Sequence, residues 1–84
     1  MTLEECAELK EIVRKNALIN AIRHDGKAQP GPVIGRVLGE KPELKTRVKE
    51  LSALVNSVVK EVNTLALSEQ KRMVEEKWPE ALVK

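Results

Sequence analysis

The sequence predicts an all-α fold, a small single-domain helical bundle of three long or medium helices plus one short helix. The first reason is its length of 84 residues, which suits one domain over residues 1–84 that buries roughly 60 to 65% of its unfolded surface. The second is that apolar residues recur at three- and four-residue steps, as on one face of a helix. The third is that all four glycines and three of the four prolines lie between Gly26 and Leu44, separating two long helical segments.

The first helix is expected over about residues 3–24, where apolar residues follow the helical period. Thr2 and Glu5 fit a capping box at its start, in which the hydroxyl accepts a hydrogen bond from a first-turn amide and the carboxylate reaches back to the amide of Thr2. Asp25 and Gly26 then provide a stop, because glycine readily takes the left-handed conformation after a last turn. Apolar residues cover more than half of the second half of this helix, so we expect it to lie centrally in the bundle.

A loop and a short second helix follow. Pro30 and Pro32 prevent the first helix from continuing, yet either proline can occupy the first turn of a new helix. The apolar residues at 33, 34, 37 and 38 give a stripe over about two turns, which Gly39 ends. Gly35 lies inside this helix at a cost of about 1 kcal/mol relative to alanine. We expect it to mark close packing against another helix, with close approach of a ligand backbone as the alternative.

Pro42 opens the third helix, whose apolar seam has a period of 3.5 to 3.6 residues. Val58 and Val59 cannot both face one apolar stripe, so one of them is expected to be exposed. That exposed valine, together with the wide apolar coverage of the first helix, is the sequence support for a protein-interaction surface. The seam comprises Leu44, Val48, Leu51, Val55, Val58, Val62 and Leu65.

The fourth helix is expected over residues 69–77, with Ser68 as its N-cap and Pro79 beyond its end. Residues 68–70 have an adequate explanation as cap and first-turn residues, so we assign them no ligand. Trp78 is the only aromatic residue. It is expected to close the bottom of a small core rather than to stack on a base or anchor a partner.

The sequence carries no recognisable catalytic or metal centre, and none is predicted. Cys6 and His24 are the only cysteine and histidine, whereas a metal site needs three or four ligands and a disulfide needs two cysteines. There is no P-loop, and no segment has the 18 or so apolar residues of a membrane span. Residues 1–20 hold four glutamates where a signal peptide would have an apolar core, so a cytoplasmic protein is expected.

The net charge of +2 is divided unevenly along the chain. Residues 1–13 balance at −3, with four acidic residues against one basic, and residues 50–84 at −1, with six against five. Residues 14–49 hold nine basic residues against three acidic, a balance of +6, which is where a polyanion would bind. This segment also holds Asn16 and Asn20, one helical turn apart. Either the basic residues form a solvated face and these two asparagines bond locally, or the segment contacts RNA. The candidate contacts are Asn16, Asn20, Arg23, Lys27, Arg36, Lys41 and Lys45.

Six blocks resemble, in order and spacing, the N-terminal appended region of archaeal-type glutamyl-tRNA synthetases. A more distant likeness connects G-K-A-x-P and the apolar helix after it with the helical tail domain of the amidotransferase B subunit. The blocks are residues 16–21 (N-A-L-I-N-A), 26–30 (G-K-A-Q-P), 33–39 (V-I-G-R-V-L-G), 42–44 (P-E-L), 62–63 (V-N) and 69–70 (E-Q).

The resemblance implies a cytoplasmic ligase that attaches glutamate to tRNA with ATP and magnesium. The catalytic Rossmann domain of that family, with its H-I-G-H-like motif and lysine-bearing loop, has no counterpart in these 84 residues. The chain is therefore expected to be an N-terminal fragment of a larger synthetase, without the ATP-binding and catalytic residues.

The role implied for such a fragment is accessory. It would contact tRNA or dock on the catalytic domain of the same synthetase. The alternative is a protein–protein interaction module that joins other synthetases in an assembly. A helix-turn-helix DNA-binding domain fits the size and charge, but residues 26–32 hold two prolines in place of a short glycine turn.

Overall fold

A computed structural model describes residues 7–82, and these form an all-α bundle with no strand, which confirms the predicted fold class. The capping box predicted at Thr2 and Glu5, and the single cysteine Cys6, lie outside the described residues. None of the described helices is long and apolar enough to cross a membrane. The elements, in chain order, are α1 (Ala7–Arg23), α2 (Pro30–Glu40), the 3-10 helix η2 (Pro42–Arg47), α3 (Val48–Asn63), α4 (Leu67–Lys77) and the 3-10 helix η3 (Pro79–Leu82).

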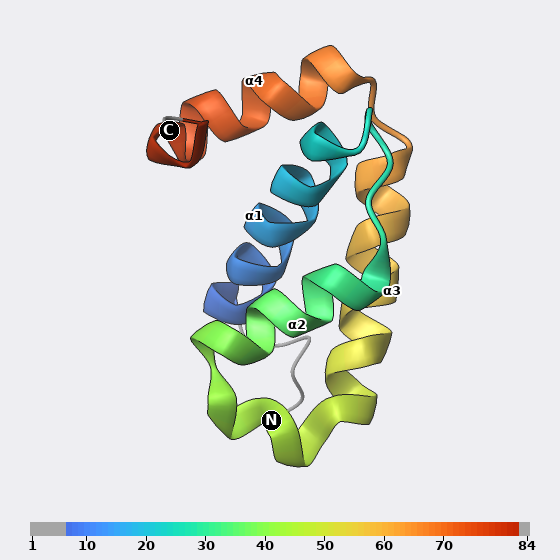
Figure 1. The fold of residues 1–84 in the computed structure, drawn as a ribbon, viewed down its shortest axis with the longest axis vertical. Coiled ribbons are helices and arrows are strands. Elements are labelled where there is room, and N and C mark those ends of the chain that lie inside the picture. Colours follow the sequence, from blue (N-terminus) through green and yellow to red (C-terminus); the bar gives the residue numbers. More distant parts are fainter. Residues whose placement is uncertain (1–6, 83–84) are drawn as a thin grey trace.

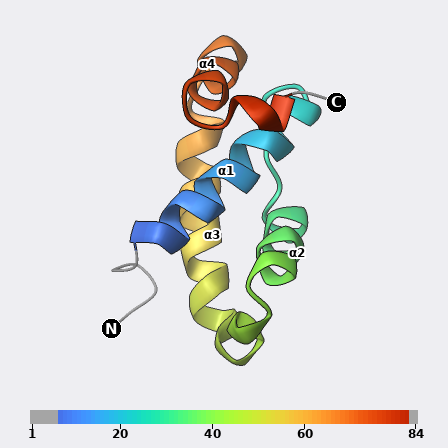
Figure 2. The same ribbon diagram turned by 90° about the vertical axis from the view of Figure 1, so that its left-hand side faces the viewer.

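Helix α1 is the centre of the bundle, as predicted, because it packs against α2, α3 and α4 (Figures 1 and 2). Ala17 and Ala21 are fully buried on it, and their small side chains let the neighbouring helices approach closely. Burial of apolar side chains along the helix contacts is the main favourable contribution to folding. The buried apolar residues are Leu9, Val13, Ala17, Leu18, Ala21, Ala28, Val33, Val37, Leu44, Leu51, Leu54, Val55, Val58, Val59, Val62 and Val74.

Helix α3 corrects two expectations about the long apolar seam. Val58 and Val59 are both 5% exposed, because α3 packs against α1 and also against α2 and so buries more than one stripe. The prediction that one of them is exposed was therefore wrong. Val48 is 40% exposed although the seam included it. Residues 42–47 form the 3-10 helix η2, whose three residues per turn change the register between Leu44 and the rest of the seam.

Helix α2 begins at Pro30, with Pro32 also in its first turn, and it ends at Glu40, one residue beyond the predicted stop. Val33 and Val37 are fully buried, as the short apolar stripe predicted. Gly35 is exposed, and a Cβ atom built on it would meet no atom of another element within 4 Å. The predicted close packing of helices at Gly35 is therefore wrong, and close approach of a ligand there stays a prediction.

Helix α4 begins at Leu67, one residue before the serine that we expected to cap it. The N-cap residue is Ala66, no side chain caps the helix, and Ser68 is exposed, so the predicted Ser68 cap is wrong. The helix ends at Lys77, and Pro79 begins η3. Trp78 is half-buried and packs against the core, as expected.

Candidate functional site

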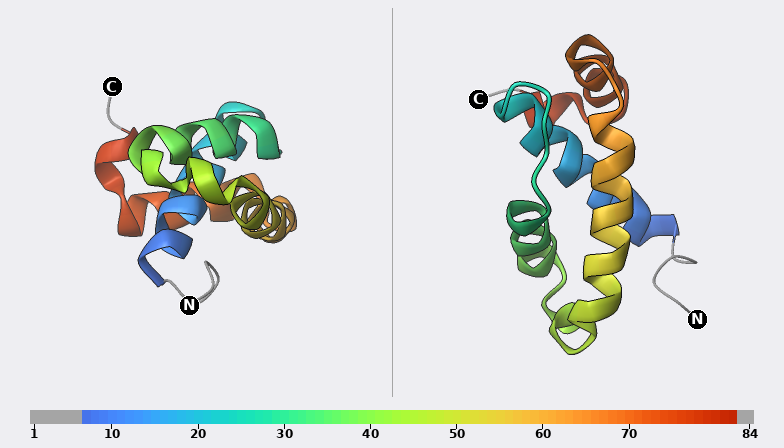
Figure 3. Two further views of the ribbon diagram at one scale, coloured as in Figure 1. Left: turned by 90° about the horizontal axis from the view of Figure 1, so that it is seen from below. Right: turned by 90° about the vertical axis from the view of Figure 1, so that its right-hand side faces the viewer.

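The turn after α1 has the backbone geometry that Asp25 and Gly26 predicted. Both residues have positive φ angles, 58° for Asp25 and 92° for Gly26. The Gly26 amide donates a 2.7 Å hydrogen bond to the carbonyl of Ala21, which closes the end of the helix. The chain then continues through Lys27, Ala28 and Gln29, which run alongside α3 (Figure 3, right).

Three amide side chains, one each from α1, α3 and α4, hold the loop of residues 26–29. The Asn20 carbonyl oxygen accepts from the Gln29 amide at 2.8 Å. Asn63 bonds both backbone groups of Ala28, accepting from its N–H at 2.7 Å and donating to its C=O at 3.2 Å. A loop whose backbone groups are bonded from several helices has little freedom to move.

The third of these side chains, Gln70, is fully buried. Its Nε2 group donates to the carbonyls of Gly26 at 3.0 Å, Val62 at 2.9 Å and Leu65 at 3.3 Å. Its Oε1 atom has no hydrogen-bond partner among the described residues. Gln70 therefore connects the loop to the C-terminal end of α3 and to the connector that follows it.

The sequence placed Gln70 in the first turn of a helix and gave no role to Asn63. Both residues belong to short blocks, 62–63 and 69–70, that carry the family resemblance. A buried amide surrounded by backbone carbonyls leaves no periodic signal in a sequence. The two-residue blocks were the only available sign that these positions matter.

Asn16 and Asn20, predicted to donate to RNA, are only 4% and 6% exposed. The Asn16 Nδ2 group donates to the Ile12 carbonyl at 2.9 Å and to Glu40 Oε2 at 2.7 Å, which ties α1 to the end of α2. Asn20 holds the loop. Both side chains are thus buried and bonded within the domain, which favours the alternative that the asparagines bond inside the fold, and an RNA contact by either stays a prediction.

The predicted basic contacts lie on the surface but do not form one cluster. Arg23, Lys27, Arg36 and Lys45 are exposed, whereas Lys41 is half-buried and its amine lies 3.6 Å from Glu8 Oε1. The elements that carry these cations extend from the α1 end and the loop, through α2, to η2 at the opposite end of the domain (Figure 1). The longest dimension of the domain is 34 Å, so these basic residues are spread along its length rather than gathered at one point.

Lys27 differs from the other cations in the way its backbone is fixed. Its side chain is exposed, while the next residue, Ala28, is 5% exposed and bonded through both backbone groups to Asn63. The Lys27 amide also donates to the His24 carbonyl at 3.3 Å. The position of the Lys27 Cα atom is therefore well defined, and its amine extends from a stiff support.

Arg47, a further cation of the basic segment, binds Glu50 through two hydrogen bonds of 2.6 and 3.0 Å. The bond from Arg47 lowers the pKa of Glu50 below its usual value, and the same bond raises the pKa of Arg47. Within residues 7–82, no group of three His, Cys, Asp or Glu side chains could hold a metal ion.

Comparison with known proteins gives matches at high identity. The chain is 55% identical over 73 residues to the glutamate–tRNA ligase of Pyrococcus furiosus, 58% over 73 residues to that of Thermococcus kodakarensis, and 48% over 75 residues to that of Ignicoccus hospitalis. It is a relative of one small part of archaeal glutamate–tRNA ligases.

The matches cover 87 to 89% of this chain but only 13% of each of these glutamate–tRNA ligases. The resemblance drawn from the six blocks is thereby confirmed, while an N-terminal place in the synthetase stays a prediction. No protein-family model matches the chain, and no solved structure matches it significantly.

Proposed function

We propose that this chain is a non-catalytic, N-terminal accessory domain of a cytoplasmic glutamate–tRNA ligase, and that it assists aminoacylation by contacting tRNA phosphates. The similarity to glutamate–tRNA ligases over 87% of the chain supports the assignment to such an enzyme. The parent ligase would join glutamate to tRNA with ATP and magnesium. The residues for that chemistry would belong to the catalytic domain, on which this domain docks.

The observation that carries the tRNA proposal is Lys27, an exposed cation on a loop that three buried or bonded amides hold in place. A lysine amine binds a phosphate oxygen as a point charge and needs no shaped pocket. Because the loop is already ordered, binding loses little backbone entropy there. Exposed Arg23, at the end of α1 just before the loop, adds a second positive charge nearby.

Arg36 on α2 and Lys45 on η2 would continue a strip of positive charge toward the far end of the domain. Both are exposed and make no ion pair within the described residues. Lys41 contributes less, because its amine lies against Glu8. Such spacing suits a polyanion that passes along the domain rather than a single phosphate group.

The test measures binding of an archaeal glutamate tRNA to the chain by fluorescence anisotropy over a range of salt concentrations. The variant Lys27→Ala with Arg36→Ala is expected to bind more weakly. Its log–log salt slope should fall by about 0.7 to 0.9 for each phosphate that the variant no longer neutralises.

The matched control is Lys60→Ala with Lys71→Ala, which removes the same charge from exposed positions on α3 and α4. If this control weakens binding as much as the test variant, net charge accounts for the affinity and the strip has no special role. An unchanged affinity of the Lys27 and Arg36 variant at low salt would refute the proposal.

A further inference from the structure

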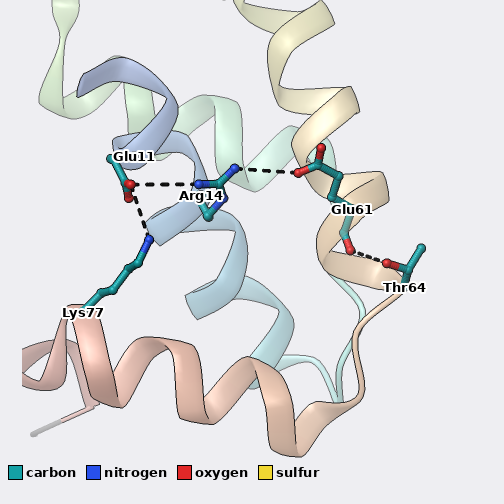
Figure 4. A network of polar contacts seen from close by, with 5 residues as sticks. All are labelled: Glu11, Arg14, Glu61, Thr64 and Lys77. Atoms are coloured by element: carbon teal, nitrogen blue, oxygen red, sulfur yellow. Dashed lines mark hydrogen bonds and ion pairs between the residues drawn. The ribbon is translucent and has the colours of Figure 1, made fainter. Parts of the chain in front are cut away.

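A groove on the side of the bundle formed by α1, α3 and α4 is not used in the proposal above. It consists of two adjoining hollows of about 250 and 310 Å³, which share Arg14 and Glu61 between them. We call it the Arg14 groove. Figure 4 shows Arg14 of α1 reaching toward Glu61 of α3 on one side, with Glu11 on its other side.

Arg14 has more hydrogen-bonding capacity than its neighbours use. Its guanidinium lies 3.9 Å from Glu11 Oε1 and 3.8 Å from Glu61 Oε2, and it makes no other polar contact within residues 7–82. Both distances exceed the 2.7 to 3.2 Å typical of a hydrogen bond. Five N–H donors are therefore held at the groove without a short acceptor, in an arrangement suited to a bidentate carboxylate.

The first hollow places further polar groups around Arg14. Lys10 lies one helical turn earlier on α1, is exposed, and has no ion-pair partner in the described part of the chain. The exposed Ser57 faces it from α3, with Leu54 beneath. Two cations and a hydroxyl around a small hollow are complementary to an acidic side chain.

The second hollow is apolar. Most of its accessible surface comes from Val62, Leu65 and Met73, beside Thr64 and the two shared residues; Leu65 and Met73 are only half-buried, so apolar surface remains accessible. Methionine is flexible and adapts to partners of different shapes. A large apolar side chain placed there would bury this surface, at about 25 cal/mol for each Å² removed from water.

We propose that the Arg14 groove docks an acidic segment of the synthetase polypeptide, with a carboxylate on Arg14 and Lys10 and a large apolar side chain in the second hollow. The inference rests on the relation to glutamate–tRNA ligases, but not on RNA binding. Relatives carry 87% of their length outside the matched part, which provides ample chain to dock.

The groove suits a peptide better than RNA. Glu11 and Glu61 both lie against Arg14 and would repel a row of phosphates. A phosphate backbone also carries no apolar group that could fill the second hollow. A single carboxylate can replace Glu61, whose side chain is 66% exposed and can rotate into solvent. The Arg14–Glu61 contact that it replaces is worth little on a surface.

The test uses overlapping 15-residue peptides that tile the Pyrococcus furiosus glutamate–tRNA ligase outside the 73 matched residues. Labelled chain is applied to the immobilised peptides, and the affinity of the strongest binder is then measured by fluorescence anisotropy. The expected binders carry Asp or Glu within about four residues of a large apolar side chain, since one helical turn spans that distance. Arg14→Gln should weaken binding about tenfold, because hydrogen bonds to charged groups are the strong ones.

Met73→Gln should also weaken peptide binding, because it makes the second hollow polar. Lys10→Gln should weaken peptide binding as well, because it removes the second cation, and an exposed position carries little risk to the fold. Lys49→Gln is the matched control: it removes one positive charge from an exposed residue that lines neither hollow, and it should leave peptide affinity unchanged. Circular dichroism melting of each variant is the check that the variant still folds.

Two results would overturn the docking inference. The first is that no peptide distinguishes the parent chain from Arg14→Gln and Met73→Gln. The second is that the chain dimerises in sedimentation and Arg14→Gln abolishes the dimer, because a second copy would then occupy the groove. The tRNA proposal has its own readout, so either result leaves it standing.

Discussion

Replacing Gln70 with methionine tests how strongly one buried amide holds the loop to the rest of the domain. Methionine is unbranched, of similar size and similar helix propensity, so packing and local preference change little. The hydrogen bonds that disappear are those to the carbonyls of Gly26, Val62 and Leu65. Val62 keeps a partner, because its carbonyl also accepts from the Leu65 amide at 3.1 Å.

The expected loss of unfolding free energy follows from these hydrogen bonds. The Nε2 group has two hydrogens, so its three contacts amount to two hydrogen bonds, one of them shared between two carbonyls. Because their loss leaves buried carbonyls without a donor, each costs about 1.5 kcal/mol, or about 3 kcal/mol together. The same substitution removes the buried Oε1 atom that has no partner among the described residues, which returns about 1 kcal/mol. The net loss of about 2 kcal/mol lowers Tm by about 8 to 16 °C for a domain of this size.

Urea unfolding followed by circular dichroism measures this change. At an m-value of about 1 kcal/mol/M, the midpoint should fall by about 2 M while m stays the same. Gln29→Met is the matched control: Gln29 is the only other glutamine, its side chain is exposed, and it makes no capping bond, so its stability should change by less than about 0.5 kcal/mol. A Gln70→Met midpoint within about 0.5 M of the parent would refute the reasoning.

Two further predictions concern a glycine and an exposed ion pair. Gly35→Ala should raise the stability by about 0.5 to 1 kcal/mol, because the added Cβ atom meets no atom of another element within 4 Å and alanine is the better helix former. A lower Tm in thermal unfolding would show that the methyl group meets an obstacle. Glu50→Gln removes a carboxylate whose pKa Arg47 lowers; such a pair stabilises the fold above the unfolded pKa and ceases to do so as pH falls through the lower folded value. The difference in Tm between parent and variant should therefore shrink as pH falls below the unfolded pKa of about 4.3, and a difference that stays constant as the pH falls further would contradict the assignment.

The sequence located the helices because the signals for them are local. Asp25 and Gly26 end α1, Pro30 opens α2, and the apolar period marks the faces that are buried. Such signals depend on residues a few positions apart, so they can be read without knowing the fold. The same is true of the exposed cation Lys27, whose charge and place in a loop were evident from the sequence.

Contacts between distant segments could not be read in this way. Asn63 and Ala28 are separated by 35 residues, and Gln70 and Gly26 by 44, so nothing local predicts that they meet. Val59 was expected to be exposed if Val58 was buried, because a single stripe was assumed, whereas α3 is covered on more than one side. Each of these outcomes is decided by how the helices pack, which follows from the whole chain at once.

Gln70 also relates the two surfaces proposed here to each other. Its amide bonds Gly26 of the loop that carries Lys27, and it bonds Val62 and Leu65, whose side chains line the apolar hollow of the Arg14 groove. Loss of this amide should therefore loosen both surfaces, so Gln70→Met should weaken tRNA binding and peptide binding together. Substitution of Lys27 or Arg14 removes one charge and leaves these bonds in place, so each should affect only its own ligand. A Gln70→Met variant that is destabilised but keeps both affinities would show that neither surface depends on this shared support.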